Sequence, residues 1–535
     1  MMTDIQIANS TNLKPIQDIA AALGLSSADL IPFGNIKAKI IAARAKAARA
    51  AKRGKLILVT ATNPTPMGEG KTTVSIGLAD GIARLNKKVC LALREPSLGP
   101  CFGLKGGATG GGYSQVAPMA DINLHFNGDL HALTAANNLL CAMIDNHLHW
   151  GNKLNIAKVY TTRALDLNDR ALRIITAGRG KVNGPERTDG FIITVATELM
   201  AMLCLARDVF ELRKMCGDII IGENEAGEFI RARDIKADGA MVALLKDAIL
   251  PNLVQTLEGV PALLHGGPFA NIAHGCNSIV ATEAALGLAD YVVTEAGFGA
   301  DLGGEKFFNI KCRKSGLRPD AVVLVATMRA IRAHGGFDNL RAHVENMRKY
   351  GAPVILALNR TGEASPEDLA EFEKFASTMN VPWAPCDAWG RGSVASEELA
   401  QKALDACGQA SDVKLLYPDD MPLIEKVRTV AREIYRAGDI APSDAVLEKL
   451  ERFAAAGFGN LPVCIAKTPA SLSHDAKLLG APAGYEFPLQ DAFLYAGAGM
   501  IVVTAGTVMR MPGLPERPAA ENIDIDESGE ITGLF

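Results

Sequence analysis

The sequence predicts an α/β fold, with a P-loop NTPase-like parallel sheet covered by helices and one or more additional smaller α/β domains. Short apolar runs alternate with longer stretches of helical periodicity, which is typical of such a sheet. A glycine-bearing loop separates one of these runs from a helical stretch, in the order that phosphate-binding loops require. The chain has 535 residues, more than one hydrophobic core usually serves, so we expect two or three domains.

The region that precedes this loop, up to about residue 53, is expected to be helical and peripheral. Residues 36–52 are rich in alanine and lysine, which are strong helix formers. The basic face of this stretch is more typical of a solvated surface than of a ligand site.

The loop itself spans residues 63–73 and reads Asn-Pro-Thr-Pro-Met-Gly-Glu-Gly-Lys-Thr-Thr. It follows the apolar run 56–59, which predicts a buried strand, and precedes a helical pattern over 74–84. Strand, loop and helix in this order predict a site for nucleotide phosphates. The alternative is a glycine-rich turn before an ordinary helix.

Each part of the predicted loop has a task that its chemistry suits. Gly68 and Gly70 allow backbone N–H groups to close on phosphate oxygens, and the helix N-terminus adds partial positive charge. Lys71 is placed to reach the outer phosphates, and the Thr72 hydroxyl to bind Mg²⁺. In the generic pattern a glycine stands where this chain has Thr65.

Further apolar runs predict the remaining strands, at residues 89–93, 218–222, 261–264, 291–294, 321–326 and 353–358. Ligands of parallel sheets bind beyond the carboxyl ends of the strands, where the polar loops of this chain stand. Residues 359–366 indicate a boundary. We therefore expect a P-loop nucleotide-binding core over 1–358 and an α/β domain over 359–535 that contributes to the ligand pocket, with strands at 462–466 and 500–504.

Polar and glycine-rich segments follow several of these runs. Arg94 and Glu95 end the second strand, where Arg94 could clamp a carboxylate or phosphoryl group, or the two could form a structural pair. Residues 105–112 include five glycines within the seven positions 106–112 and fit a ligand loop or a flexible lid equally well. Phe298, between two glycines, is suited to stack on a flat ring. His125 and His131 have no third ligand at metal spacing, which favours a structural role.

The bulk composition excludes several classes of function. Net charge is −4, so no global basic field recruits nucleic acid. No apolar run approaches the roughly 20 residues that span a bilayer, and residues 1–6 lack a signal-peptide pattern. The ten cysteines form no Cys-x-x-Cys pair and no zinc-type cluster. We expect a cytoplasmic protein with reduced, mostly buried thiols and with neither nucleic-acid nor membrane partners.

Four motifs together resemble formate–tetrahydrofolate ligase (formyltetrahydrofolate synthetase) from about residue 30 to the last residue. They are residues 64–73, Arg94-Glu-Pro-Ser-Leu-Gly-Pro100, the run from His265 to Ser278 and Met511-Pro-Gly-Leu-Pro515. The resemblance implies a cytoplasmic one-carbon enzyme, usually a homotetramer stimulated by K⁺ or NH₄⁺. It implies that MgATP and formate give formyl phosphate, which N10 of tetrahydrofolate attacks to yield 10-formyltetrahydrofolate, ADP and phosphate.

The resemblance also assigns residues by position. Lys71 and Arg94 would be catalytic, with Arg94 holding formyl phosphate, and Thr72 would bind the metal. Phe298 and Trp389 would bind folate, within a pocket for folate and nucleotide to which the second domain contributes. The ATP phosphates would be held by a run of eight residues: Thr65, Pro66, Met67, Gly68, Glu69, Gly70, Lys71 and Thr72.

Four positions depart from the pattern of the family, at Ala120, Asn127, Ile192 and Thr361. Ala120 and Ile192 replace acids, and Thr361 replaces an aromatic partner of Trp389, which would weaken ring stacking by about 1 kcal/mol. An alternative is therefore a divergent relative that uses the same acyl-phosphate chemistry on another carboxylate or pterin acceptor. A second alternative is a P-loop ATPase switch, which would leave the loops around Arg94, His265 and Phe298 unexplained.

Overall fold

The computed structural model describes residues 2–41, 53–103, 109–180, 182–360, 364–506 and 508–534. Its centre is a large sheet whose strands β15, β4, β16, β3, β17, β18 and β19 run parallel to one another. This confirms the predicted fold class. In sheet order the parallel strands are β15 (Pro261–Leu264), β4 (Val89–Leu93), β16 (Tyr291–Glu295), β3 (Lys55–Ala61), β17 (Ala321–Ala326), β18 (Val354–Asn359) and β19 (Trp383–Cys386).

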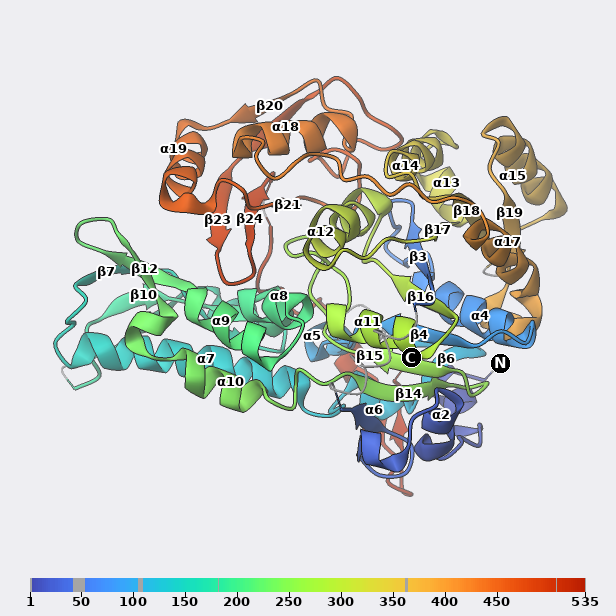
Figure 1. The fold of residues 1–535 in the computed structure, drawn as a ribbon, viewed down its shortest axis with the longest axis horizontal. Coiled ribbons are helices and arrows are strands. Elements are labelled where there is room, and N and C mark those ends of the chain that lie inside the picture. The colour runs from blue at the N-terminus through green and yellow to red at the C-terminus, as the bar shows by residue number, and fades with distance from the viewer. Residues whose placement is uncertain are drawn as a thin grey trace.

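Helices cover both faces of this sheet, as the alternation of side chains along its strands requires (Figure 1). Leu56 and Leu58 of β3 share one core with helices α11 (Ile279–Leu288) and α14 (Asp338–Arg348). Ile57 and Val59 point the other way, into a core with α4 (Lys71–Arg84) and α17 (Glu397–Cys407). Gly77 and Gly81 let α4 pack closely, because a Cβ at Gly77 would lie 2.5 Å from the Cβ of Ala388.

Antiparallel strands extend the sheet beyond β15. They are β14 (Asn252–Thr256), β2 (Ala38–Ile40), β1 (Leu30–Pro32), β6 (Ser114–Ala117) and β5 (Gly110–Gly111). The expectation that residues 36–52 form a helix is wrong at 38–40, because the Lys39 side chain is buried and paired with Asp129 at 2.8 Å. The rest of that expected helix, residues 42–52, lies outside the described residues.

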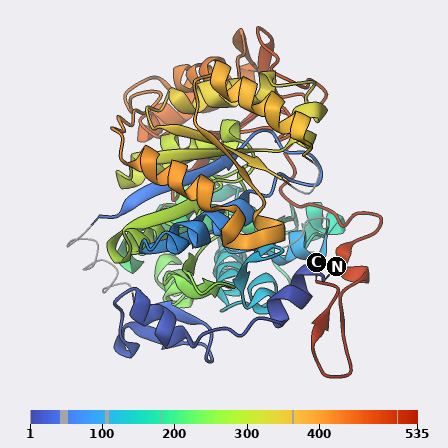
Figure 2. The ribbon, with the colours of Figure 1, turned by 90° about the vertical axis from the view of Figure 1, so that its right-hand side faces the viewer.

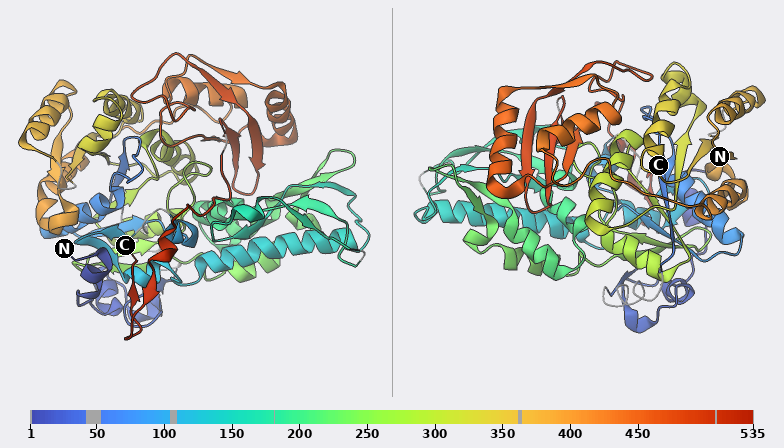
Figure 3. Two further views of the ribbon diagram at one scale, coloured as in Figure 1. Left: turned by 180° about the vertical axis from the view of Figure 1, so that it is seen from behind. Right: turned by 45° about the horizontal axis from the view of Figure 1, so that its top comes forward.

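A second group of elements extends to one side of the sheet, around the long helix α7 (Asp129–His149) (Figures 1 and 3). It contains α8 (Glu198–Leu205), α9 (Val209–Asp218), α10 (Asp238–Leu245) and the strands β7 (Ile156–Val159), β12 (Ile220–Asn224) and β13 (Phe229–Arg231). The strand expected at 218–222 forms here, but in an antiparallel sheet of its own. A tight turn with Gly227 at φ +79° joins β12 to β13, so this strand belongs to a hairpin rather than to a crossover unit.

The C-terminal lobe packs above this second group and carries the strands expected at 462–466 and 500–504 (Figure 3). Its elements are α18 (Leu423–Glu433), β20 (Asp439–Pro442), α19 (Asp444–Phe453), β21 (Val463–Ala466), β22 (Glu486–Leu489), β23 (Asp491–Tyr495) and β24 (Met500–Thr504). Three elements lie between residue 359 and this lobe: strand β19, helix α15 (Pro366–Thr378) and helix α17. All three join the large sheet or the hydrophobic cores on its faces. We therefore propose that the division between domains follows α17 rather than residue 358.

The two ends of the chain meet on one side of the molecule (Figure 2). Ile5 and Ala8 of helix α1 (Asp4–Asn9) share a small core with Leu534 and with Met119 of α6 (Met119–Asn123). Among the described residues, no helix combines the length and the apolar character that crossing a bilayer requires.

Candidate active site

The parallel strands end along one edge of the sheet, and the loops singled out from the sequence line this edge. β4 ends before Arg94, β16 ends at Glu295 before Phe298, and β3 leads into the phosphate loop. At the far end of the row, Trp389 follows β19. Parallel register brings these carboxyl ends together, which is where ligands of such sheets bind.

The phosphate loop is held in shape by its own glutamate. The Glu69 side chain is 1% exposed, and its Oε1 accepts hydrogen bonds from the backbone N–H of Thr65 at 2.7 Å and from the Thr65 hydroxyl at 2.9 Å. Its Oε2 accepts a hydrogen bond from Thr327, which follows β17. This explains why threonine replaces the usual glycine at position 65. The Thr65 backbone has no left-handed φ, so glycine is not required at this position. The Thr65 hydroxyl anchors the loop through its hydrogen bond to Glu69.

Two glycines of the loop adopt left-handed backbone. Gly68 has φ +75° and Gly70 has φ +70°. A Cβ at Gly70 would lie 2.3 Å from Nδ2 of Asn359, which donates a 3.0 Å hydrogen bond to the Glu69 carbonyl. Arg329 Nη2 donates to the Gly68 carbonyl at 2.7 Å. Pro66 and Met67 are exposed at the tip of the loop.

Helix α4 begins at Lys71, directly after the left-handed Gly70. Its first backbone N–H groups are therefore open toward the loop, and the helix dipole favours an anion there. The Thr72 hydroxyl donates a 2.8 Å hydrogen bond to Oε2 of Glu295. A hydroxyl and a carboxylate oxygen at a phosphate loop form the hard-oxygen donor set that suits Mg²⁺, so these residues fit the expected metal.

Arg94 lies at the same carboxylate. Its Nε and Nη2 each donate to Oε1 of Glu295 at 3.3 Å, and its side chain is 21% exposed while that of Glu295 is 1% exposed. The pairing of Arg94 with its neighbour Glu95, which the sequence left open, is wrong. Glu95 turns into the interior, where burial and then the nearby Asp129 raise its pKa well above the usual range.

Small residues and a buried acid shape the surroundings of Arg94. A Cβ at Gly297 would lie 2.8 Å from Nη1 of Arg94 and 2.9 Å from the Cβ of Ala270, so a larger residue there would displace the guanidinium or its neighbour. In the segment that follows Arg94, the Ser97 hydroxyl and the Leu98 N–H donate hydrogen bonds to Asp166, at 2.7 and 3.0 Å. Burial raises the pKa of Asp166 to about 6.

The two expected folate residues stand at different places on the edge. Phe298 is half-buried with φ +55°, a backbone conformation that is costly for an aromatic residue and often marks a functional position. Trp389 covers the β5–β6 hairpin, where a Cβ at Gly111 would lie 3.0 Å from its Cδ1. Their strands, β16 and β19, are four strand spacings apart, which is about 19 Å along the edge.

His265 is a structural residue rather than a catalytic one. It is fully buried, with Nδ1 2.7 Å from the Ser278 hydroxyl and Nε2 2.6 Å from the Ala248 carbonyl. Since a carbonyl only accepts, Nε2 carries the proton, and Nδ1 accepts from Ser278. Burial lowers the pKa of His265 to about 4, so the ring is neutral.

No cluster of three metal-ligating side chains occurs within the described ranges. His125 and His131 stack on each other, with Nδ1 and Nε2 2.8 Å apart. Of residues 105–112, only 109–112 are described, and Gly110 and Gly111 form β5. All ten cysteines are buried and free of disulfides, as expected.

Comparison with known proteins decides the family. The family model for formate–tetrahydrofolate ligase matches residues 2–535. Curated relatives named formate–tetrahydrofolate ligase are 54% identical in Hyphomonas neptunium and in Allorhizobium ampelinum, and 52% identical in Maricaulis maris, each over 100% of both chains. The chain belongs to the formate–tetrahydrofolate ligase family. Among solved structures, the MinC:MinD cell division complex of Aquifex aeolicus matches 68% of this chain and 99% of its own at 14% identity, with a TM-score of 0.24.

The departures from the formate–tetrahydrofolate ligase pattern lie at separate places. Ala120 is in α6, and Asn127 donates to Asn252 at 2.8 Å, beside the buried Lys39–Asp129 pair. Ile192 lines a cavity between α8 and the C-terminal lobe, and no residue of the phosphate loop lines it. Thr361 lies outside the described residues.

Sequence reasoning missed the residues that connect the loops. Glu295 joins Thr72 to Arg94, and its only signal was a carboxylate at the last position of an apolar strand. A second buried link joins the C-terminal lobe to the edge of the sheet. Lys467 Nζ lies 2.7 Å from Asp301 Oδ2, and Asn63 Nδ2 donates to both Asp301 and the Pro469 carbonyl, at 3.2 and 3.1 Å.

Proposed function

We propose that this protein ligates formate to tetrahydrofolate in an ATP-dependent reaction that passes through formyl phosphate. The observation that supports this most directly is the convergence of Thr72 and Arg94 on Glu295, beside the phosphate loop, in a chain of this family. The start of α4, which would bind an anion through its N–H groups, and the Arg94 guanidinium both lie at the side chain of Glu295. That is the arrangement that transfer of a phosphoryl group to a small carboxylate needs.

In the first step a formate oxygen attacks the γ-phosphorus of ATP, and the bond from phosphorus to the β–γ bridging oxygen breaks. ADP leaves with the bond electrons. The loop from Thr65 to Thr72 encloses the phosphates, with the backbone N–H groups at the start of α4 as donors, and Lys71 stabilises the charge that moves onto the γ-phosphoryl oxygens. Mg²⁺, held by Thr72, would neutralise phosphate charge when bound.

In the second step N10 of tetrahydrofolate attacks the formyl carbon. The carbon–oxygen bond to phosphate breaks, phosphate leaves, and N10 loses its proton, which gives 10-formyltetrahydrofolate. Arg94 holds the acyl phosphate by two parallel donors, which draws charge from the formyl group and favours attack by an amine. The Glu295 carboxylate keeps the guanidinium in place between turnovers.

For folate, we propose that Phe298 contacts the ligand near its reacting end, because it follows the strand next to β4 and Arg94. Trp389 then takes a flat ring of folate further along the edge. Trp389→Ala should raise the KM for tetrahydrofolate and leave the KM for ATP unchanged. A rise in the KM for ATP alone would assign Trp389 to the adenine instead.

We also propose a cytoplasmic homotetramer stimulated by K⁺ or NH₄⁺. Ten free, buried thiols suit a reducing compartment. Light scattering should give four times the chain mass of 56.5 kDa. Replacing K⁺ by Na⁺ at constant ionic strength should lower turnover.

The test of the proposed function is a steady-state assay with MgATP, formate and tetrahydrofolate, in which the product is read as methenyltetrahydrofolate after acidification. Product that depends on both formate and tetrahydrofolate is the expected result. Formate-dependent ADP release without that product would contradict folate as the acceptor. ADP release that is independent of formate would contradict the acyl-phosphate chemistry itself.

A further inference from the structure

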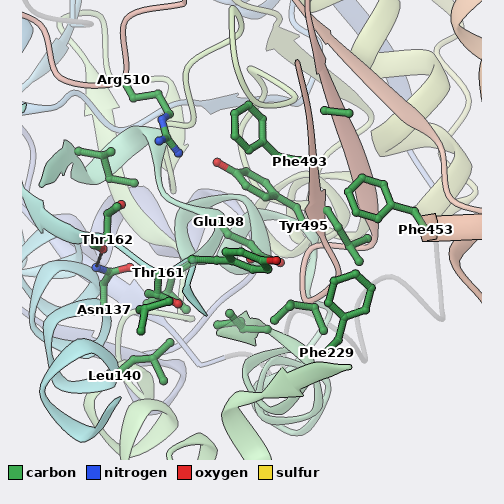
Figure 4. Close-up of a pocket in the computed structure, with 18 of the residues that line it drawn as sticks. Asn137, Leu140, Thr161, Thr162, Glu198, Phe229, Phe453, Phe493, Tyr495 and Arg510 are labelled. Carbon is green, nitrogen blue, oxygen red and sulfur yellow. Dashed lines mark hydrogen bonds between the residues drawn. The ribbon is translucent and has the colours of Figure 1, made fainter. Parts of the chain in front are cut away.

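A cavity of about 340 Å³ lies between three parts of the chain that are far apart in sequence (Figure 4). Its walls come from α7 and α8, from the β7–β12 sheet, and from α19 and β23 of the C-terminal lobe. A volume of this size matches the lower end of pockets that hold small organic ligands. None of its lining residues belongs to the loops of the candidate active site.

The wall is unusually rich in aromatic rings. Five of the twenty lining residues are aromatic, although aromatics make up only 5% of the chain: Tyr160, Phe229, Phe453, Phe493 and Tyr495. Figure 4 shows Phe493 and Tyr495 along one wall and Phe229 and Phe453 beside them. Such a wall favours a flat apolar ring over a flexible polar chain.

The charge that faces this cavity is positive. Arg510 lies with its guanidinium 5.3 Å from the centre of the Phe493 ring and hydrogen-bonds the Tyr495 hydroxyl, but the ion pairs found among the described residues do not include it. The other two basic lining residues are already paired. Lys449 contacts Asp491, and Arg452 contacts Glu223 at 2.6 Å. Arg510 is therefore the cation that remains for a ligand.

The one acidic lining residue does not oppose an anion at neutral pH. Burial raises the pKa of Glu198 to about 8, and its Oε1 accepts a hydrogen bond from the Ala498 N–H at 3.1 Å. The hydroxyl oxygen of Thr161 is buried in the same wall and makes no hydrogen bond to any described residue. A neutral carboxyl and a hydroxyl are both donors that an anionic ligand can use.

We propose that this cavity is a binding site for a small planar aromatic carboxylate, with its ring among Phe229, Phe453 and Phe493 and its carboxylate on Arg510. The aromatic wall supplies the apolar contact, and the guanidinium matches a carboxylate by two parallel hydrogen bonds. The site is separate from the phosphate loop and does not depend on the proposed ligase reaction.

Calorimetric titration of the full-length protein at pH 7 tests the site, with 2-naphthoate as the probe and 2-naphthamide as its neutral counterpart of the same shape. We expect one naphthoate per chain, bound at least tenfold more tightly than the amide, in the presence or absence of saturating MgATP. Absence of saturable binding would overturn the proposal. So would equal affinities for the two probes, or displacement of naphthoate by MgATP.

Arg510→Gln tests whether Arg510 binds the carboxylate, and it should remove the preference for naphthoate over naphthamide. Arg428→Gln, an exchange in an ion pair on the surface of α18, is the matched control and should retain the preference. A preference that survives in Arg510→Gln would overturn the assignment to Arg510. The comparison of the two probes on the unchanged protein decides the site even where a variant folds poorly.

Discussion

The Thr72 hydroxyl donates a 2.8 Å hydrogen bond to the Glu295 carboxylate, although 223 residues separate the two in sequence. The other oxygen of the same carboxylate accepts from Arg94. One buried acid therefore fixes the distance between the start of α4 and the guanidinium proposed to hold formyl phosphate. Neighbouring strands β16, β3 and β4 make this possible, because their carboxyl ends stand side by side.

Glu295→Gln should lower kcat by 10- to 100-fold. Glutamine retains one acceptor oxygen but loses the charge, so one of the two charge-assisted contacts, each worth about 1.5–3 kcal/mol, is lost or weakened. Glu397→Gln removes an exposed pair with Arg84 at the other end of α4 and serves as the control, with kcat unchanged. Equal turnover in both variants would show that Glu295 does not organise the site.

Arg94→Lys separates charge from geometry at the acyl phosphate. Lysine keeps the positive charge but lacks the planar fork that makes two parallel hydrogen bonds. We expect both Arg94→Lys and Arg94→Ala to lose most acyl transfer while nucleotide affinity, measured by calorimetry with ADP, stays within a few-fold. Full turnover in the lysine variant would mean that charge alone suffices at this position.

Gly70→Ala and Gly68→Ala form a matched pair in the phosphate loop. Both glycines have left-handed backbone, so each alanine costs about 1 kcal/mol of strain. Only at position 70 does the new Cβ meet a neighbour, Asn359 Nδ2, within 4 Å. ATP affinity should therefore fall tenfold or more in Gly70→Ala and only slightly in Gly68→Ala, as read by calorimetry. Similar losses in both would point to backbone strain as the sole cause.

The buried parallel strands could be predicted from the sequence because their side chains are covered on both faces. β4, β15 and β17 lie where uninterrupted apolar runs stand. β2 and β19 could not be predicted in this way. β2 contains Lys39, a residue type that is normally exposed and is buried here only because it pairs with Asp129. β19 is a short strand that contains a proline.

The candidate site shows the same limit. Loop residues such as Lys71 and Arg94 stand out because a local pattern surrounds them. Glu295, Asp166 and Asn359 act through hydrogen bonds to residues of other loops, from 68 to 290 positions away. No spacing within one segment encodes such contacts, since they arise only when the strand order of the sheet is formed.

The buried imidazole of His265 should make stability fall in mild acid. Its pKa is lowered by burial to about 4, whereas an unfolded histidine titrates near 6.5. Between these values the unfolded chain binds a proton that the folded protein excludes, so the stabilisation is complete above pH 6.5 and is lost as pH falls toward 4. The shift corresponds to about 3 kcal/mol for this residue.

His265→Gln tests this account through the free energy of unfolding in urea at several pH values. Glutamine can still donate to the Ala248 carbonyl and accept from Ser278, but it does not titrate, so stability should change less between pH 6.5 and 4 than in the unchanged protein. His149→Gln, at the exposed end of α7, is the control and should follow the original curve. Because His343 is also buried with its pKa lowered to about 4, part of the acid dependence should remain in His265→Gln. An unaltered pH dependence in His265→Gln would place the acid-sensitive group elsewhere.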